Sequence, residues 1–364
     1  IPTVGVGEST ISKVKQWTKF LGIDDKEFLK HTDGTIKFSI KFTDFNGKDE
    51  AGFHYPFGPV ITEGTQLNYN DWWVKKEFYP ETPVSDYAES FAPNMALVNQ
   101  RKGAFKFHNF ELDRDSAYQF DATKFGLWLR DHYCLPRGVK HIQEDIIDVP
   151  TNENGIKCVV TKTYSYYADL FVDCTGFKSM LLGGALKEPF ETIKNLPNNK
   201  AWATRIPYVD KEKEVECFTN CTAIENGWVW NIPLWSRIGT GYVYSDKFVD
   251  KETIQKEQLE HWNNKGYNPS IGKQLSWTPG RYKRSWVKNC MAVGLSEGFL
   301  EPLEATNLAF TVIAIGNLGK LLYETQNMYN EAMGSHISRM FSLQVDEMVN
   351  FIYMHYRMQW AHRG

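Results

Sequence analysis

The 364-residue chain lacks an excess of basic charge and has no run of lysines and arginines. It carries 41 Lys and Arg against 44 Asp and Glu, a formal net charge of −3. Nucleic-acid-binding proteins present a strongly positive surface, so this balance predicts no nucleic-acid partner. No apolar run reads as long enough to span a membrane and no secretory leader is apparent, which predicts a protein that does not act at a membrane.

Cysteine is also scarce in the sequence. The chain has six cysteines, at positions 134, 158, 174, 217, 221 and 290. Only Cys217 and Cys221 are close together, and no second pair of Cys or His lies nearby, which argues against a metal site. Scattered cysteines in a chain of this length are typical of reduced, buried thiols, and they predict a cytoplasmic location.

The glycine fingerprint G-x-G-x-x-G, which places a dinucleotide pyrophosphate at a helix N-terminus, is absent. A nucleotide site therefore has to be argued from other segments. Gly5 and Gly7 let the backbone pass close to a ligand, and Ser9 or Thr10 can cap the helix that follows them. The run Leu170–Gly176 reads as a parallel strand whose carboxyl end approaches a ligand, or as an ordinary sheet strand.

A strand, a turn and a helix follow one another within Cys290–Phe310. The apolar strand breaks at Gly294, and the chain runs through E-P-L-E at residues 301–304 to a helix that Thr306 or Asn307 can cap. A glycine turn that leads into a helix presents backbone N–H groups to an anion. The pattern therefore predicts either an anion site flanked by two glutamates or a buried turn whose glutamates are solvated.

Aromatic residues make up 15% of the chain, which suits a stacking pocket as well as a large core. Trp228 and Trp230 stand two apart in the segment Gly227–Pro233, so both indoles project from one face of a strand. They either pack in the core or form a wall of a pocket. The loop Phe53–Gly58 is also aromatic and reads as a surface cluster or a stacking site.

Two lysines fall on the polar face of a predicted strand between Gly34 and Phe45. Ile36, Phe38, Ile40 and Phe42 alternate there with polar residues that include Lys37 and Lys41. The pattern alone favours a solvated strand face for both lysines.

Periodicity and turn residues predict the remaining elements. Helices are expected over about 118–132, 250–262 and 337–352, strands from 138–142, over 156–160 and across 200–245, and a hairpin turn at 152–155.

Two of these segments together carry a family resemblance. Residues 298–306, G-F-L-E-P-L-E-A-T, look like the G-F-x-E-P-L-E-(S/A)-T signature of the flavin-dependent halogenases, which include the tryptophan halogenases. The segment Gly227–Pro233 is similar to the W-x-W-x-I-P motif of the same family. The resemblance implies an α/β, FAD-binding flavoprotein monooxygenase-like fold with an interleaved substrate module and C-terminal helices. It implies one domain, 1–364, in which the flavin module takes about 1–33, 110–185 and 285–317 and the substrate module about 34–109, 186–284 and 318–364.

The resemblance also implies roles for individual residues. Lys37 matches the essential lysine, with Lys41 as the runner-up, and Glu304 matches the carboxylate that stabilises the cationic ring intermediate and takes its proton. Halide binding falls on Thr306 and on Asn307, which stands where the family carries glycine. The flavin contacts fall on Gly7, Glu8, Ile40, Ile142, Gly176, Gly294 and Leu308. The substrate contacts fall on Tyr55, Phe57, Trp228, Trp230 and Glu304, and Tyr55 stands where tryptophan-specific members carry histidine.

The implied activity is halogenation of an electron-rich aromatic substrate with reduced FAD, oxygen and halide. A separate flavin reductase is the implied partner and supplies the reduced FAD. A homo-oligomer remains open as an alternative to a monomer. Two other functions fit the same sheet: a flavin-dependent aromatic monooxygenase, and a non-catalytic halogenase-like binding protein. The paired tryptophans and the E-P-L-E stretch argue against the monooxygenase, whereas the absent glycine fingerprint motivates the binding protein.

Overall fold

A seven-stranded sheet forms the centre of the protein. The computed structural model describes residues 7–47, 52–58, 69–83, 85–103, 115–269 and 272–360. The strand order is β16 (Lys273–Ser276), β12 (Lys200–Ile206), β15 (Ile238–Tyr244), β14 (Gly227–Pro233), β13 (Phe218–Ile224), β3 (Ser39–Thr43) and β4 (Phe53–Pro56). Neighbouring strands are antiparallel except β13 and β3, which are parallel. The strands predicted across 200–245 are confirmed.

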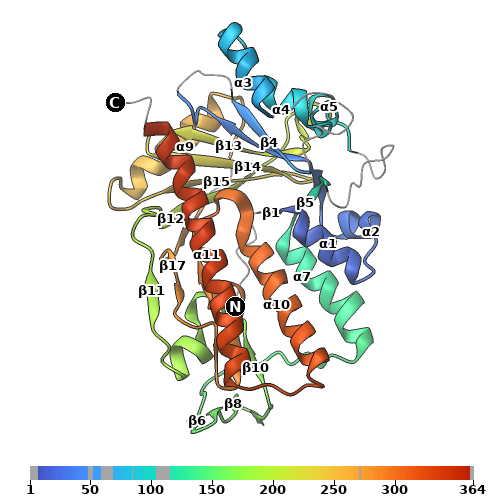
Figure 1. Cartoon of the computed structure of the whole chain (residues 1–364), viewed down its shortest axis with the longest axis vertical. Coiled ribbons are helices and arrows are strands. Elements are labelled where there is room, and N and C mark those ends of the chain that lie inside the picture. Colours follow the sequence, from blue (N-terminus) through green and yellow to red (C-terminus); the bar gives the residue numbers. More distant parts are fainter. Residues whose placement is uncertain are drawn as a thin grey trace.

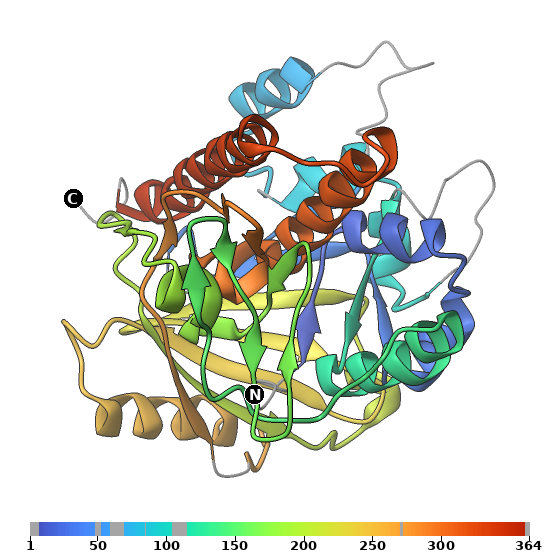
Figure 2. The ribbon, with the colours of Figure 1, turned by 90° about the horizontal axis from the view of Figure 1, so that it is seen from below.

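Helices cover both faces of this sheet, and Figure 2 shows the sheet between α9 and the pair α10 and α11. On one face, α9 (Lys251–Asn263) packs Ile254 and Trp262 against the side chain of Val229. On the other face, α11 (Glu331–Trp360) packs its apolar stripe against Trp228 and Trp230. Successive side chains of a strand point to opposite faces, so β14 contributes to both layers. The predicted helices at 250–262 and 337–352 are confirmed.

Smaller sheets surround the large one (Figure 1). They are β1–β5–β2, β10–β19–β18, β11–β17–β20, β6–β7 and β8–β9. The strands are β1 (Glu8–Ser9), β2 (Thr35–Lys37), β5 (Ala117–Phe120), β6 (Thr151–Asn152), β7 (Gly155–Ile156), β8 (Val159–Val160), β9 (Ser165–Tyr166), β10 (Phe171–Asp173), β11 (Phe190–Thr192), β17 (Gly280–Tyr282), β18 (Trp286–Val287), β19 (Cys290–Ala292) and β20 (Gly298–Phe299). Strands β10 and β19 pair in parallel, as expected for buried strands of this kind, and the hairpin predicted at 152–155 joins β6 to β7.

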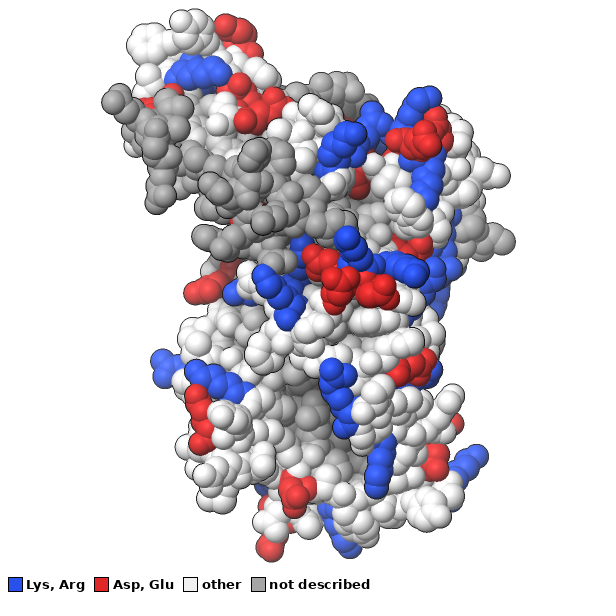
Figure 3. Space-filling view, turned by 90° about the vertical axis from the view of Figure 1, so that its right-hand side faces the viewer, with Lys and Arg blue, Asp and Glu red and all other residues white. Residues whose placement is uncertain are grey.

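The remaining helices are mostly short. They are α1 (Ser12–Phe20), α2 (Asp25–His31), α3 (Tyr69–Phe78), α4 (Ser85–Phe91), α5 (Asn94–Asn99), α7 (Ala122–Trp128), α8 (Lys211–Glu214) and α10 (Thr306–Glu324). The irregular helical turns are η1 (Leu129–Cys134), η2 (Leu135–Arg137), η3 (Gly176–Lys178), η4 (Met180–Ala185), η5 (Gly294–Ser296) and η6 (Leu303–Ala305). On the face shown in Figure 3, acidic and basic side chains are intermixed.

The strand predicted between Gly34 and Phe45 changes sheets at Phe38. Its first part, β2, pairs with β5, whereas its second part, β3, pairs with β13 and β4 in the large sheet. The expected solvated face is therefore wrong for Lys37, whose side chain is 0% exposed, because the polar face of β2 is covered by other parts of the chain. Lys41, four residues later, is partly exposed.

Three predicted boundaries are corrected by the structure. The segment Gly138–Ile142 forms no strand, and Ile142 is exposed on a coil that follows η2. The residue that caps α1 is Ile11, because the hydroxyls of Ser9 and Thr10 bond to other parts of the chain. The helix expected over 118–132 starts later, since β5 occupies residues 117–120.

Helix α10 and the turn before it correct another expectation. The segment Leu303–Glu324 is long and apolar enough to cross a membrane by length and composition, although no such run was expected from the sequence. A core helix passes the same test. In this protein the segment contacts α1, η5 and α11, and it buries Ala309, Ala314 and Leu318 against its neighbours.

Candidate active site

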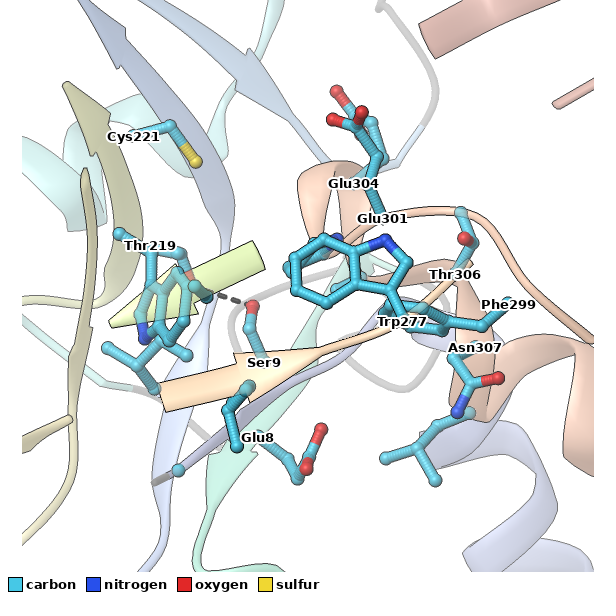
Figure 4. A pocket seen from close by; sticks show the side chains of 18 of the residues that line it. Glu8, Ser9, Thr219, Cys221, Trp277, Phe299, Glu301, Glu304, Thr306 and Asn307 are labelled. Atoms are coloured by element: carbon cyan, nitrogen blue, oxygen red, sulfur yellow. Dashed lines mark hydrogen bonds between the residues drawn. The ribbon is translucent and has the colours of Figure 1, made fainter. Parts of the chain in front are cut away.

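A cavity of about 330 Å³ lies beside the seven-stranded sheet, at the N-terminus of α10. Segments far apart in the sequence line it: β1, the strands β3, β13, β14 and β16, the turn η5, and the stretch from β20 into α10. In Figure 4, Glu301 and Glu304 lie at one end of this pocket and Glu8 at the opposite end. The indole of Trp277 lies between them in that view.

The wall formed by residues 301–307 has an unusual backbone. Glu304 and Ala305 both adopt left-handed conformations, with φ of 68° and 52°. Non-glycine residues rarely do so, and each such residue costs about 1–3 kcal/mol. Helix α10 starts immediately afterwards, and Ala305 at its N-cap offers no side-chain hydrogen bond, contrary to the predicted cap by Thr306 or Asn307. Thr306 and Asn307 instead form the first turn and line the pocket, where helix N–H groups favour an anion.

Glu304 is buried in the pocket wall and faces a histidine from α11. His355 Nε2 lies 2.9 Å from Glu304 Oε1, and both side chains are less than a tenth exposed. Oε1 makes no well-aligned hydrogen bond within the described part of the chain, so the contact is an ion pair by distance. Burial by itself lowers the pKa of His355, but the neighbouring Glu304 outweighs it, and the net effect is a raised pKa.

Glu301 has neutral partners instead of a cation. The hydroxyl of Tyr356 donates to Glu301 Oε1, and Asn198 Nδ2 lies 3.5 Å from Oε2. The same hydroxyl accepts from Asn198 Nδ2 at 2.9 Å and from Trp228 Nε1 at 3.0 Å. Burial raises the pKa of Glu301 to about 7, although its hydrogen bonds oppose this. Near neutral pH the pocket therefore contains a second carboxyl group that is partly protonated.

Trp228 and Trp230 lie on the same face of β14, as their spacing predicts. Their ring centroids are 6.1 Å apart with planes tilted by 59°, and both line the pocket. The indole N–H of Trp230, like that of Trp277, has no hydrogen-bond partner among the described residues. A buried donor without a partner costs about 1–3 kcal/mol, so a ligand that accepts from either indole gains that energy back.

Lys37 lies behind the pocket wall. Its Nζ donates to Ser9 Oγ at 2.7 Å and to the Thr10 carbonyl at 2.9 Å, and Ser9 itself lines the pocket. Burial lowers the pKa of Lys37 to about 7, although the neighbouring Glu304 and, after it, Cys221 act in the opposite direction. The lowered pKa makes a neutral, nucleophilic amine accessible near pH 7. The ring of Phe57 lies 5.1 Å from the same Nζ.

Glu8 and Gly7 form the end of the pocket away from the two glutamates. Burial, with a contribution from Asp121, raises the pKa of Glu8 to about 7. Gly7 has a φ of 113°, a conformation that residues with a Cβ rarely adopt. This backbone allows the chain to run along the cavity beside Ile232 and Leu234.

The structure brings together most, but not all, of the predicted site residues. Nine of them line the pocket: Gly7, Glu8, Ile40, Trp228, Trp230, Glu304, Thr306, Asn307 and Leu308. Gly176 and Gly294 each stand next to a lining residue, Phe177 and Leu295. Lys37 and Phe57 lie behind the wall. Tyr55 is 48% exposed and Ile142 lies on an exposed coil, and neither lines this cavity.

Several pocket groups were missed from the sequence. Cys221 and Trp277 line the cavity, and His355 and Tyr356 hold its two glutamates. The helical spacing over 337–352 predicts the buried face of α11, which continues to both residues. That pattern distinguishes a core side chain from a solvated one, but it does not show which side chains meet a carboxylate.

Among the described residues, this apolar pocket has a helix start without a side-chain cap, two indole N–H groups without a partner and two glutamates held in different ways, and it fits an aromatic ligand together with an anion. The tryptophan halogenase family model matches residues 1–362 of the chain. The tryptophan 6-halogenase ThaL of Streptomyces albogriseolus is 30% identical over 98% of this chain and 69% of its own length. The tryptophan 7-halogenase RebH of Lentzea aerocolonigenes is 32% identical over the same shares.

Solved structures agree with this match. The apo structure of VirX1 has a TM-score of 0.91 at 38% identity, covering 98% of this chain and 70% of VirX1. Xcc4156, a flavin-dependent halogenase from Xanthomonas campestris, has a TM-score of 0.86 at 28% identity over the same shares. The chain belongs to the tryptophan halogenase family. It is a flavin-dependent oxidoreductase that uses FAD and halide to halogenate an aromatic compound, and the predicted fold class is confirmed.

The residues present fit the flavin. An isoalloxazine ring needs an apolar slot with a few polar groups at its edges, and this cavity offers Ile40 and Leu308 as apolar walls. Two polar groups line its edges: the buried carboxyl of Glu8 and the indole N–H of Trp277, which has no partner among the described residues. The left-handed backbone at Gly7 lets the chain pass close to a bound ring. Bound in its reduced form, FAD would supply with oxygen the oxidation of halide to hypohalous acid, and oxidised FAD and water would be the other products.

Proposed function

We propose that this pocket halogenates an electron-rich aromatic compound through Lys37 and Glu304. The observation that carries the proposal is the buried lysine, since its amine is 0% exposed, has a pKa lowered to about 7 and is bonded to pocket-lining Ser9. A neutral amine is the form that attacks hypohalous acid to give an N-haloamine and water. The protonated amine can instead hydrogen-bond the acid, so both forms near pH 7 serve to deliver halogen.

Halide binding is assigned to the first turn of α10. The N–H groups of Thr306 and Asn307 stand at a helix N-terminus that no side chain of the described segments caps. Asn307 stands where a glycine is expected, and its larger side chain lines the pocket and limits the space for halide. The preferred halide is therefore expected to depend on the residue at position 307.

Glu304 is proposed as the group that receives the ring proton. Halogen adds to the ring to form a cationic intermediate, and loss of a proton from the same carbon restores aromaticity. An ionised carboxylate on the pocket wall stabilises that cation and accepts the proton. Glu304 lies on the pocket wall with the imidazole of His355 beside it, whereas Glu301 has neutral partners and a raised pKa.

The substrate is proposed to be an indole, pyrrole or phenol. The relatives ThaL and RebH are tryptophan halogenases, so indole compounds, including tryptophan, are the first to test. Trp228 and Trp230 are proposed to separate the flavin from the substrate. Tyr55 and Phe57 are proposed as the substrate-stacking positions, although only Phe57 lies near Lys37.

Flavin binding is proposed for Gly7, Glu8, Ile40, Gly176, Gly294 and Leu308. Ile142 is not retained in this proposal, since its predicted strand is absent and its side chain is exposed. A separate flavin reductase is proposed to deliver the reduced FAD. The division into flavin and substrate modules, a cytoplasmic location and a homo-oligomer stay predictions.

The test is a halogenation assay with FAD, a flavin reductase, NADH and either chloride, bromide or iodide. Indole, tryptophan, pyrrole and phenol are supplied in turn, and products are identified by mass spectrometry. Bromine incorporation that is lost in Lys37→Met and Glu304→Gln supports the proposal. Gain of a single oxygen instead of bromine would indicate the monooxygenase.

Full activity of Lys37→Met combined with an inactive Lys41→Met would assign the catalytic role to Lys41 instead of Lys37. Failure to bind FAD, tested by the yellow colour of the purified protein, together with no product from any substrate, would favour a non-catalytic binding protein.

A further inference from the structure

Two successive residues of α11 each contact one of the pocket glutamates. His355 Nε2 is 2.9 Å from Glu304 Oε1, and the hydroxyl of Tyr356 donates to Glu301. Glu301 and Glu304 are 2% and 5% exposed. A single helix on the face of the sheet away from α9 therefore contacts both glutamates at this end of the pocket, in two different ways (Figure 2).

The hydrogen bonding of His355 determines which of its nitrogens carries a proton. Its Nδ1 lies 2.8 Å from the Phe351 carbonyl oxygen, one helical turn earlier. A carbonyl oxygen only accepts, so Nδ1 carries a hydrogen. A neutral imidazole would then place an unprotonated, partly negative Nε2 at 2.9 Å from a carboxylate oxygen, and two atoms of negative charge repel at that distance. A second proton on the ring removes this repulsion and makes the contact a pair of opposite charges.

Packing holds the imidazole ring in this orientation. The ring of Phe351 lies 4.8 Å from it, edge to face at 89°, and the ring of Phe42 lies 5.1 Å away on the sheet side. These contacts restrict rotation of the His355 ring. The ring therefore offers the Glu304 carboxyl group a partner in a fixed position.

Other charged or titratable groups act on the same pair. Glu301 acts on His355, and Lys37, Cys221 and Tyr55 interact with Glu304. Among these, Lys37 directs its Nζ to Ser9 Oγ and to the Thr10 carbonyl oxygen, and not to Glu304. His355 is the basic group in direct contact with Glu304 among the described residues.

We propose that His355 is a positioning residue for the halogenation reaction, which holds the Glu304 carboxyl group fixed at the pocket wall. The inference rests on the role proposed above for Glu304. It predicts that His355 never touches the substrate, and that its loss changes the rate of proton removal more than it changes substrate binding.

The first test is independent of halogenation. Full-length protein labelled with ¹⁵N-histidine is titrated by NMR, with the His355 resonance assigned by its loss in His355→Gln. We expect a doubly protonated ring near pH 7 in the wild type and a neutral Nδ1–H ring in Glu304→Gln. A neutral ring in the wild type, or an unchanged ring in Glu304→Gln, would overturn the proposal whether or not the protein halogenates anything.

The second test measures bromination of indole. For His355→Leu we expect kcat to fall by roughly tenfold to a hundredfold, less than the 10²–10⁴ that a general base contributes, with KM within about twofold. His355→Gln restores a donor and is expected to retain more of the rate. His336→Gln, an exposed histidine of the same helix, is the matched control and should keep the full rate.

A folded His355→Leu variant with wild-type kcat would refute the proposal. So would an equal loss in His355→Leu and His355→Gln accompanied by a raised KM. If no variant and no wild-type protein brominates indole while the NMR result holds, the proposed function fails and the ion pair stands.

Discussion

Replacing Lys37 by Met should stabilise the protein while abolishing halogenation, and the stabilisation should depend on pH. Lys37 is fully buried, and its burial lowers its pKa from 10.5 to about 7. This difference corresponds to roughly 5 kcal/mol in favour of the neutral amine. Below pH 7 the folded protein has to keep a charged ammonium away from water, a cost that Met does not carry.

The pH window follows from the two pKa values. Between pH 7 and 10.5 the unfolded chain keeps the proton of Lys37 and the folded protein has lost it, so the free energy of unfolding of the wild type rises with pH. From pH 7 to 9 the rise is roughly 2.5 kcal/mol. The variant lacks this contribution, so its advantage over the wild type shrinks by the same amount. Met also leaves Ser9 Oγ and the Thr10 carbonyl without their donor, which lowers the advantage equally at both pH values.

The measurement is thermal unfolding of both proteins by calorimetry at pH 7 and pH 9. A domain of 364 residues changes its Tm by roughly 1.3 °C per kcal/mol. The difference in Tm between variant and wild type should therefore shrink by about 3 °C from pH 7 to pH 9. Lys41→Met, on the partly exposed lysine four residues later, serves as the comparison variant. A difference in Tm that is the same at both pH values would show that Lys37 does not change its charge in this window.

Three further outcomes follow from the pocket wall and its supports. Glu304→Gln should lower kcat for indole bromination by about 10²–10⁴ with an unchanged circular dichroism spectrum, and a smaller loss would assign proton removal elsewhere. Ala305→Gly should raise the free energy of unfolding in urea by about 1 kcal/mol, because Ala305 has a φ of 52° and glycine adopts this left-handed conformation without strain. An unchanged free energy of unfolding would mean that the turn is not strained. Trp228→Phe removes the N–H that donates to Tyr356, and it should lower the free energy of unfolding in urea by about 1–2 kcal/mol. In a Tyr356→Phe background the same substitution should cost less, and an equal cost would contradict the assigned hydrogen bond.

The sequence indicated the parts of the site that lie within one element. The spacing of Trp228 and Trp230 predicts their shared face, and the strand–glycine–helix pattern predicts a helix that begins just after Thr306 or Asn307, one to two residues later than the observed start at Thr306. These features depend on local backbone geometry, which the spacing of apolar residues and the identity of turn residues indicate directly. The four strands across 200–245 were predictable for the same reason, since their alternation and turns are local.

Contacts between distant segments could not be read in the same way. The polar face of the strand around Lys37 looked solvated, but β1 and the residues after it cover that face, and they precede Lys37 by 27 and 28 residues. The partners His355 and Glu304 are farther apart still. Ile142 shows the converse, because its segment Gly138–Ile142 was predicted as a strand and forms a coil in the structure.

The strand that changes sheets at Phe38 ties the cavity to a single piece of backbone. Residues 35–37 belong to the β1–β5–β2 sheet and residues 39–43 to the seven-stranded sheet, with one residue between them. Any hinge that separated these two sheets would have to bend the chain at that residue and break the hydrogen bond between Ser9 Oγ in β1 and Thr219 Oγ1 in β13. Ligand entry by swinging the sheets apart is therefore disfavoured, and exchange of small molecules has to rely on the mouth of the cavity and on side-chain motion.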